Sequence, residues 1–366
     1  MSISGAQTPA APRFDDAARD YDALLVLSFG GPEGPADVMP FLENVTQGRS
    51  IPRDRLAEVA EHYHHFGGVS PINAQNRALI DVLDADLRAN GVRLPIYFGN
   101  RNWHPFVADT VARMRDDGVA RALVFVTSAF SSYSGCRQYR EDVVRALATI
   151  GAGAVAFDKI RVFYNHPGFV GPMAARVREA VSRLPEADRA DVEVVFTAHS
   201  IPLAMARGCA YEAQLQEACR LVADAASRPR FRLAYQSRSG SPHVPWLEPD
   251  ILDAVEDLHA AGRDTVVVVP IGFISDHMEV LFDLDEEATA RAQDLGMTLI
   301  RAGTVGTDPD FVAMIRELIL ERTAANPVRL ALGSRGPNHD ICPLGCCLRG
   351  EGRPAPPITA TADAGD

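Results

Sequence analysis

The stretch VEVVFTAHSIP, residues 192–202, is the strongest indication of the fold. Its apolar, β-branched residues predict a buried strand of a parallel sheet. The run ends at His199 and Ser200, and Pro202 prevents a regular strand from continuing. Ligands bind at the carboxyl ends of such strands in open α/β sheets, so we expect His199 to face a pocket.

A second stretch has the same form. TVVVVPIGF, residues 265–273, leads into ISDHME, residues 274–279. Two strand ends then present His199 and Glu279, a base and a carboxylate. The sequence therefore predicts a pocket built between these two side chains.

Strands and helices alternate along the rest of the chain. Further strands are predicted over residues 22–29, 94–99, 120–128 and 159–164 in the first half, and over 231–236 and 297–302 in the second. Such alternation predicts parallel sheets joined by right-handed crossovers. We predict an α/β fold of two Rossmann-like, doubly wound halves, each with a four-stranded parallel sheet, facing a central cleft.

The length and composition suggest how the 366 residues are divided. We expect a flexible N-terminal tail over residues 1–20, a first Rossmann-like domain over 21–165 and a second over 166–308. A C-terminal helix and cysteine-bearing segment is expected over 309–354, followed by a disordered tail over 355–366, where glycine and proline accumulate.

Charge and hydropathy exclude several classes of protein. A net charge of −12 argues against a nucleic-acid binder. Apolar runs stop near ten residues, short of the roughly 20 that span a bilayer, and no secretory signal pattern opens the chain. Six cysteines in such a chain favour metal or redox chemistry over disulfides. We expect a cytoplasmic monomer without a transmembrane segment.

Two other motifs are better explained by structural roles than by nucleotide or metal binding. The turn Gly30-Gly31-Pro32 lacks the glycines of a dinucleotide fingerprint, so it predicts a tight turn in a pocket wall. The segment EHYHHFGG, residues 61–68, carries three histidines whose spacing gives no i, i+4 pair. A polar pocket wall or surface is favoured there over a metal site.

An acidic row follows the second strand end. Glu279, Asp283 and Glu287 fall at i, i+4 and i+8, which places them on one face of a helix. Like charges in this arrangement slightly destabilise an exposed helix. The row is either a solvated face or a path that conducts cations or protons, and the sequence leaves both interpretations open.

The C-terminal motif CPLGCC, residues 342–347, holds three thiols on a Gly/Pro-rich segment. Iron–sulfur clusters and tetrahedral zinc both take four ligands. The fourth ligand must come from Cys136, Cys209 or Cys219. Cys209 and Cys219 lie in or near an amphipathic helix, whereas Cys136 lies in the loop-like YSGC, so Cys136 is the better candidate. The spacing alone does not distinguish iron–sulfur from zinc.

Six motifs together resemble the ferrochelatases, specifically the soluble bacterial type, over nearly the whole chain. They are SFGGP (28–32), HFGGVSPIN (65–73), SSYSGCRQYRED (131–142), FTAHSIP (196–202), YQS…PWLEPD (235–250) and VPIGFISDHMEVLFDLD (269–285). The resemblance implies insertion of ferrous iron into a porphyrin with release of two protons. It makes His199 the active-site histidine and Glu279 the essential glutamate, the two residues that handle the substrate iron.

The resemblance also implies roles for residues around this pair. Asp283 and Glu287 fall on an acidic metal or proton path. The positions that line or border the porphyrin pocket are Phe29, Arg49, Ser70, Tyr139 and Trp246. Soluble relatives often have a tyrosine where Phe29 stands, and Phe29 cannot ligate a metal. More of the chemistry then rests on His199 as a neutral imidazole and on the Glu279 carboxylate.

The four cysteines match another feature of the resemblance. Some ferrochelatases bind a [2Fe–2S] cluster through one internal and three C-terminal cysteines. Cys136, Cys342, Cys346 and Cys347 have that layout. The resemblance therefore favours iron–sulfur over zinc.

The substrate is expected to be coproporphyrin III. The segment EGPADVMPFLENVTQGRS, residues 33–50, is mixed and polar, unlike the apolar lips of relatives that use protoporphyrin IX. Arg49, Arg137 and Arg140 are candidate partners for its four propionates. The alternatives are a protoporphyrin IX ferrochelatase, a cobalt or nickel chelatase, and a non-catalytic haem or porphyrin carrier. The His199–Glu279 pair argues against the carrier.

Overall fold

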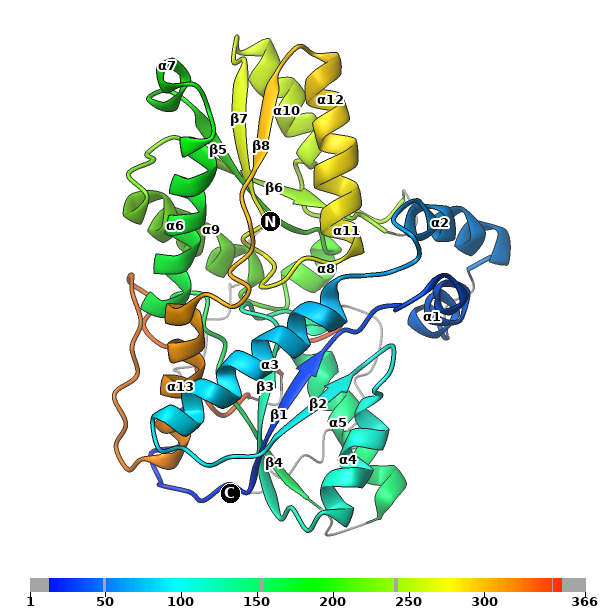
Figure 1. Cartoon of the computed structure of the whole chain (residues 1–366), viewed down its shortest axis with the longest axis vertical. Coiled ribbons are helices and arrows are strands. Elements are labelled where there is room, and N and C mark those ends of the chain that lie inside the picture. The colour runs from blue at the N-terminus through cyan, green and yellow to red at the C-terminus, as the bar shows by residue number, and fades with distance from the viewer. Residues whose placement is uncertain (1–12, 49–50, 152–154, 240–242, 344, 351–366) are drawn as a thin grey trace, which may run out of the picture.

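The computed structural model describes residues 13–48, 51–151, 155–239, 243–343 and 345–350. Two four-stranded sheets lie one above the other in Figure 1. The first has the order β2-β1-β3-β4, and the second β6-β5-β7-β8. All of their strand pairs are parallel, so the predicted fold class is confirmed. Residues 1–12 of the tail expected over 1–20, and the whole tail expected over 355–366, lie outside the described residues.

The strands are β1 (Ala23–Ser28), β2 (Ile96–Asn100), β3 (Arg121–Val126), β4 (Ala156–Lys159), β5 (Glu193–His199), β6 (Phe231–Gln236), β7 (Thr265–Val269) and β8 (Thr298–Arg301). The helices of the first half are η1 (Pro35–Asp37), α1 (Val38–Val45), α2 (Arg53–His65), α3 (Ile72–Ala89), α4 (Val107–Asp116), η2 (Tyr133–Arg137) and α5 (Gln138–Ile150). Those of the second half are α6 (Pro167–Ser182), α7 (Glu186–Arg189), α8 (Leu203–Ala206), α9 (Tyr211–Ala225), α10 (Ile251–Ala260), α11 (Met278–Val280), η3 (Leu281–Ala288), α12 (Thr289–Asp294) and α13 (Pro309–Thr323).

The fourth strand differs from its prediction. The apolar run at 159–164 predicted a strand, but β4 ends at Lys159, after pairing residues 156–159 with 121–124 of β3. The residues that follow leave the sheet and pack in the core between the two halves, where Ile160, Val162 and Phe163 are at most 3% exposed. A β-branched apolar run satisfies strand pairing and deep burial equally well, which explains the shift.

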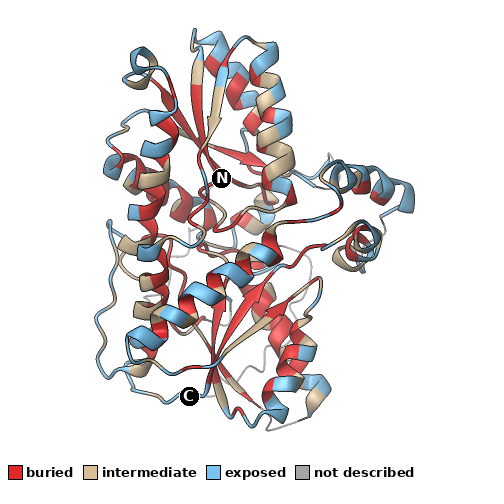
Figure 2. Ribbon diagram, viewed as in Figure 1, coloured by how far each residue is buried: buried red, intermediate tan, exposed pale blue. Residues whose placement is uncertain are grey.

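One large apolar cluster joins the two halves. It contains inward-facing residues of β1 and β3, residues of β5 and β7, and side chains from α3, α6, α9 and α13. Figure 2 shows this buried core running through the middle of the molecule. Helix α13 packs against both α3 and α6, so the last helix closes the junction between the halves. The domain boundaries drawn from the sequence stay predictions.

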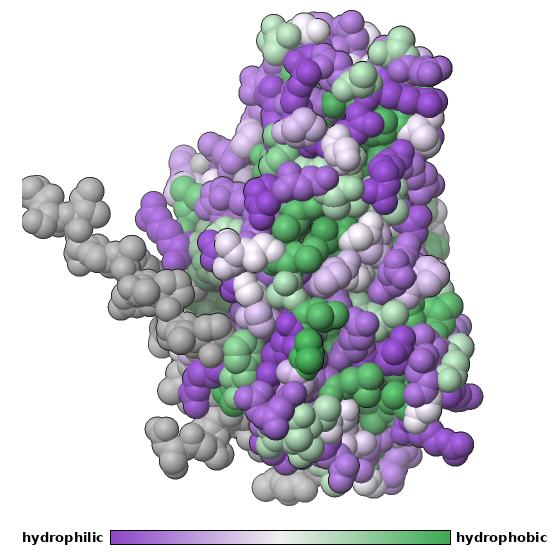
Figure 3. Space-filling model, turned by 90° about the vertical axis from the view of Figure 1, so that its left-hand side faces the viewer, coloured by the Kyte–Doolittle hydropathy of each residue, from purple (hydrophilic) through white to green (hydrophobic). Residues whose placement is uncertain are grey.

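The surface is mixed in character. Figure 3 shows the face to the left of Figure 1, where hydrophobic residues gather in separate small groups among hydrophilic ones. Within the described residues, no helix is both long and apolar enough to cross a membrane.

Candidate active site and metal centre

His199 is the last residue of β5, where the sequence predicted a strand end. Its Nδ1 lies 2.5 Å from the Ser200 carbonyl oxygen, so Nδ1–H donates there and Nε2 faces away. Nε2 lies 3.5 Å from Oε2 of Glu279. The structure therefore brings together the base and the carboxylate that the two strand ends were expected to present.

The charges of this pair depend on each other. Burial lowers the pKa of His199, but Glu279, the Ser200 carbonyl and Asp283 together outweigh burial and raise it to about 9. Burial raises the pKa of Glu279, whereas neighbouring His199 lowers it to about 2. At neutral pH these shifts favour an imidazolium beside a carboxylate, whereas the neutral imidazole expected from the sequence is the form that accepts a proton. The two side chains are 32% and 47% exposed, so water reaches both and the pair adds little to stability.

Asp283 extends the site from η3. Its Oδ2 accepts hydrogen bonds from the Ser237 hydroxyl and from Gln236 Nε2, the latter at 3.3 Å. Gln236 stands opposite His199 in the β5–β6 register, and its Nε2 also lies 3.3 Å from the Glu279 carbonyl oxygen. Burial and the Glu279 charge raise the pKa of Asp283 to about 7. Asp283 can therefore gain or lose a proton near neutral pH.

Helix α2 lies beside the outer end of the acidic row. The His62 ring stacks on Phe282 with centroids 3.8 Å apart and planes within 9°. His65 Nε2 lies 3.4 Å from Glu286 Oε1. Burial raises the pKa of Glu287, and nearby His62 opposes that shift. The row from Glu279 thus ends beside histidines, in line with the polar wall or surface favoured for this motif.

Tyr63, also on α2, is a site residue that the sequence reasoning missed. Its hydroxyl lies near the acidic pair, since burial, Glu279 and Asp283 all raise its pKa. Its ring packs against Phe41 at 5.8 Å. One hint in the sequence was that Tyr63 belongs to the histidine-rich segment EHYHHFGG. The hydrophobic periodicity of that segment does not predict that α2 contacts the second half of the molecule.

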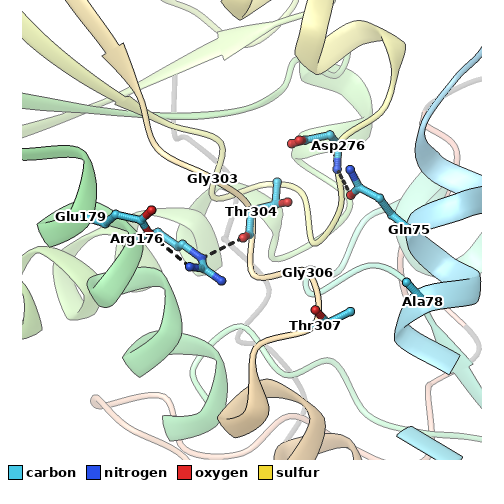
Figure 4. Close-up of a pocket in the computed structure, with 9 residues that line it drawn as sticks. All are labelled: Gln75, Ala78, Arg176, Glu179, Asp276, Gly303, Thr304, Gly306 and Thr307. Atoms are coloured by element: carbon cyan, nitrogen blue, oxygen red, sulfur yellow. Dashed lines mark hydrogen bonds and ion pairs between the residues drawn. The ribbon is translucent and has the colours of Figure 1, made fainter. Parts of the chain in front are cut away.

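The loop before Glu279 is held by contacts with both halves. The Gly272 amide donates to the Thr197 carbonyl at 3.0 Å, and a Cβ on Gly272 would lie 2.7 Å from Ala198 Cα. Only glycine allows that approach. Figure 4 shows Gln75 of α3 meeting Asp276, whose amide donates to Gln75 Oε1 at 2.8 Å beside a hollow of about 380 Å³. These contacts fix the loop that carries His277 and leads to Glu279.

The residues expected at the porphyrin pocket lie in different environments. Phe29 is 38% exposed and faces Phe41 at 6.3 Å, and Trp246 forms a β-bridge with Pro202, three residues after His199. Ser70 is buried, and its amide donates to the Pro32 carbonyl at 2.9 Å. Tyr139 is 5% exposed in the core of the first half. Arg49 lies outside the described residues.

The two other arginines expected to pair with propionates are used elsewhere. Arg137 is 3% exposed, its Nε donates to Glu141 at 2.9 Å, and its Nη1 donates to the Cys346 carbonyl at 3.1 Å. Arg140 has its Nε and Nη2 buried beside the cysteines. The expectation for this pair was wrong, because both side chains turn toward the cysteine segment.

The structure gathers the four cysteines named from the sequence. Cys346 Sγ lies 3.4 Å from Cys347 Sγ, Cys342 interacts with Cys136 and Cys346, and Cys347 interacts with Cys136. Contact with Cys136 lowers the pKa of Cys342, and contact with Cys342 and Cys347 lowers that of Cys346, whereas contact with Cys136 and Cys346 raises that of Cys347. The lowered pKa values of Cys342 and Cys346 favour the thiolate form that binds metal.

The surroundings of this group fit a buried metal centre. Cys136, Cys342 and Cys347 are at most 6% exposed. His339 joins them, since its Nε2 lies 3.7 Å from Cys346 Sγ and the donor atoms of His339, Cys342 and Cys346 lie within 4.8 Å of one another. Cys219 is fully buried in the apolar core, and the Cys209 thiol donates to the Met205 carbonyl at 3.4 Å. A buried group of thiols and one imidazole offers the ligand types that metal centres use.

Two facing parallel sheets with the His–Glu pair at a strand end define a chelatase fold. The sirohydrochlorin chelatase SirB from Bacillus subtilis subspecies spizizenii, solved in complex with cobalt, is similar with a TM-score of 0.50. That likeness covers 83% of this chain and 96% of SirB at 10% sequence identity, which supports the fold alone.

Sequence comparison identifies the family within this class. A family model described as Ferrochelatase matches residues 21–323. The ferrochelatase of Rhodopirellula baltica is 55% identical over 335 residues, covering 91% of this chain and 95% of the relative. The coproporphyrin III ferrochelatase of Streptomyces griseus is 51% identical, covering 94% and 97%. The chain belongs to the ferrochelatase family.

Proposed function

We propose that this enzyme inserts ferrous iron into coproporphyrin III, giving coprohaem in haem biosynthesis with release of two protons. Family membership supports the reaction, and relatives such as the Streptomyces griseus enzyme support the substrate. The observation that carries the chemistry is the His199–Glu279 pair, 3.5 Å apart and backed by Asp283.

The pair suits an exchange of metal for proton. In the absence of iron, His199 Nε2 and the Glu279 carboxylate share one proton, because the pKa of the first is raised and that of the second lowered. Imidazole and carboxylate are both ligands that ferrous iron accepts without trapping it. Iron that binds between them displaces the shared proton. Handing iron to the ring frees both groups to accept protons from the two pyrrole nitrogens.

Asp283 is the proposed next acceptor. Its pKa of about 7 lets it take a proton from the pair at neutral pH and release it again. Glu287 and the α2 histidines continue this path toward the outer end of the row. Protons thus leave along the side chains of η3, away from the ring.

Cys136, Cys342, Cys346 and Cys347 are the proposed ligands of a [2Fe–2S] cluster. Such a cluster supplies a one-electron redox centre and a cross-link between η2 and the C-terminal segment. The group of His339, Cys342 and Cys346 also suits zinc, so metal and sulfide analysis decides between the two.

The test is anaerobic mixing of the protein with ferrous iron and either coproporphyrin III or protoporphyrin IX, followed by visible absorption. We expect fast metallation of coproporphyrin and slow or no metallation of protoporphyrin. His199→Ala should reduce the rate at least 100-fold, since general acid–base groups contribute about 10²–10⁴-fold, while porphyrin binding persists. Retained turnover in that variant would contradict the assigned role.

Other results would change the proposal in defined ways. Preference for protoporphyrin keeps the enzyme class and moves the protein to the alternative substrate. Tight binding of both porphyrins without metallation favours the non-catalytic carrier. The cytoplasmic location and the monomeric state expected from the sequence stay predictions.

A further inference from the structure

Arg140 is a partly buried cation near the cysteine group. It lies on α5, four residues after Cys136 and therefore one helical turn away. Its Nε and Nη2 are buried and have no hydrogen-bond partner among the described residues. Buried polar groups usually have partners, and an unpaired buried charge is costly. The side chain therefore needs an anionic neighbour.

Lys159 is a second cation at the same place. It ends β4, and its Nζ donates to the Ile160 carbonyl at 3.0 Å. Burial and the Arg140 charge lower its pKa, but the sulfurs of Cys136 and Cys342 outweigh them and raise it. The sulfurs of all four cysteines likewise raise the pKa of Arg140 against the effect of burial. Two like charges thus share one partly buried site.

The adjacent carboxylates are engaged with other groups. Glu141 accepts from Arg137 Nε at 2.9 Å and from the Tyr133 hydroxyl at 3.0 Å. Asp158 accepts from Arg121 Nη1 at 2.8 Å and from the Tyr21 hydroxyl at 3.0 Å. The cysteine sulfurs are the acidic groups that raise the pKa values of Arg140 and Lys159, so we take them as the source of the compensating charge. Neutral thiols or disulfides would leave both cations without a counter-charge.

We propose that Arg140 and Lys159 are the counter-charges of the cysteine-bound cluster and that they raise its reduction potential. This inference rests on the proposed cluster. An oxidised [2Fe–2S]²⁺ core with four thiolates carries two negative charges, which the two cations balance. Reduction adds one electron without breaking a bond, so the reduced cluster carries one more negative charge. Fixed cations stabilise that form more than the oxidised one.

The test is a potentiometric titration of the purified protein under argon, with dithionite as reductant, followed by visible absorption and electron paramagnetic resonance. Arg140→Gln and Lys159→Gln should each lower the equilibrium constant for one-electron reduction at least tenfold, a shift of about 59 mV to lower potential. Arg140→Lys, which keeps the charge, should stay near wild type. Arg145→Gln is the matched control, because Arg145 lies on the same helix and its side chain is 63% exposed.

The outcomes distinguish a role of the positive charge of Arg140 from a role of the shape of its guanidinium group. Loss of the cluster from Arg140→Gln, with retention in Arg140→Lys, supports the proposal because the charge alone differs. Equal loss from both variants overturns it, since the fit of the guanidinium would then matter. Full cluster content with an unchanged potential in both glutamine variants also overturns it. A wild-type protein without iron and sulfide refutes the cluster itself, which separates that failure from failure of the counter-charge role.

Discussion

His166 is a single buried residue whose protonation should affect the pH dependence of stability. It is 1% exposed, and its Nδ1 accepts a hydrogen bond from the Gly168 amide at 3.1 Å where α6 begins. Burial, followed by nearby Arg161, lowers its pKa to about 4. An unfolded histidine binds a proton below about pH 6.5. The unfolded state therefore gains protons between about pH 6.5 and 4 while the folded side chain stays neutral, and stability falls as the pH falls through this range.

His166→Asn should flatten this part of the pH profile, because asparagine keeps a helix-capping oxygen and does not titrate. Between pH 7 and pH 4 we expect the wild type to lose on the order of 3 kcal/mol more unfolding free energy than the variant. Glu317 Oε2, 3.5 Å from His166 Nε2, acts in the opposite direction and makes this an upper value. Urea titrations at several pH values measure the difference. Parallel profiles, or the same change in the exposed His259→Asn control, would contradict the assignment to His166.

At this scale the sequence predicts the chemistry of the site better than its electrostatics. His199 ends β5 and Glu279 follows the loop after β7, so their meeting could be anticipated from the pattern alone. The residues that control their charges could not, because Gln236 and Ser237 come from a neighbouring strand and its end. Ser237 reaches Asp283 from a backbone with φ of 61°, a conformation with no clear signature in the sequence. The raised pKa of His199 depends on the distance between its Nε2 and the Glu279 carboxylate, which the sequence does not give.

Helix α13 stabilises the junction of the halves through a buried ion pair. Glu321 accepts from Arg161 Nε at 2.7 Å and from Nη2 at 2.8 Å, and Nη2 also donates to the Leu330 carbonyl at 2.8 Å. Arg161 is 1% exposed, so removing the carboxylate leaves a buried cation without its counter-charge. Glu321→Gln should therefore lower the unfolding free energy by about 3–5 kcal/mol, measured by urea denaturation.

An exposed pair provides the control for this prediction. Glu179 lies 3.2 Å from Arg176 and its side chain is 65% exposed, so Glu179→Gln should cost no more than about 1 kcal/mol. The double variant Arg161→Met/Glu321→Leu should recover much of the lost stability, since apolar replacements of buried pairs are often neutral or better. If Glu321→Gln were as mild as the exposed control, the pair would not stabilise the junction.

The elements themselves were largely predictable, with two instructive exceptions. Strand β6 has the predicted bounds, and α13 begins at residue 309, where the C-terminal helix was expected, because an N-cap aspartate and a proline mark its start. The acidic segment was predicted as an ordinary helix, yet residues 281–288 form the π-helical η3. A π-helix uses the same residue types as an α-helix, and such segments often occur at functional sites. The displaced β4 is a similar case, because a β-branched apolar run does not distinguish a strand from a buried extended segment outside the sheet.

The largest apolar cluster includes parts of both sheets, while each half also has a smaller cluster of its own. Two predicted domains with separate cores would unfold independently, whereas a shared core favours a single cooperative transition. The chain carries two tryptophans, and each reports on one half. Trp103 packs beside the α1–α2 cluster of the first half, and Trp246 bridges to Pro202 in the second.

We therefore expect Trp103→Phe and Trp246→Phe, each with one remaining tryptophan, to report coincident urea midpoints that also match far-ultraviolet circular dichroism. The physical reason is that unfolding either half would expose the side chains of α3, α6 and α13 that the other half needs for its own core. Each substitution can itself lower stability and shift the urea midpoint. Circular dichroism of the same variant measures that shift, so the fluorescence midpoints can be corrected for it. Midpoints that remain apart after this correction would mean that the junction opens first. In that case the boundary expected near residue 165 would separate two independently stable domains.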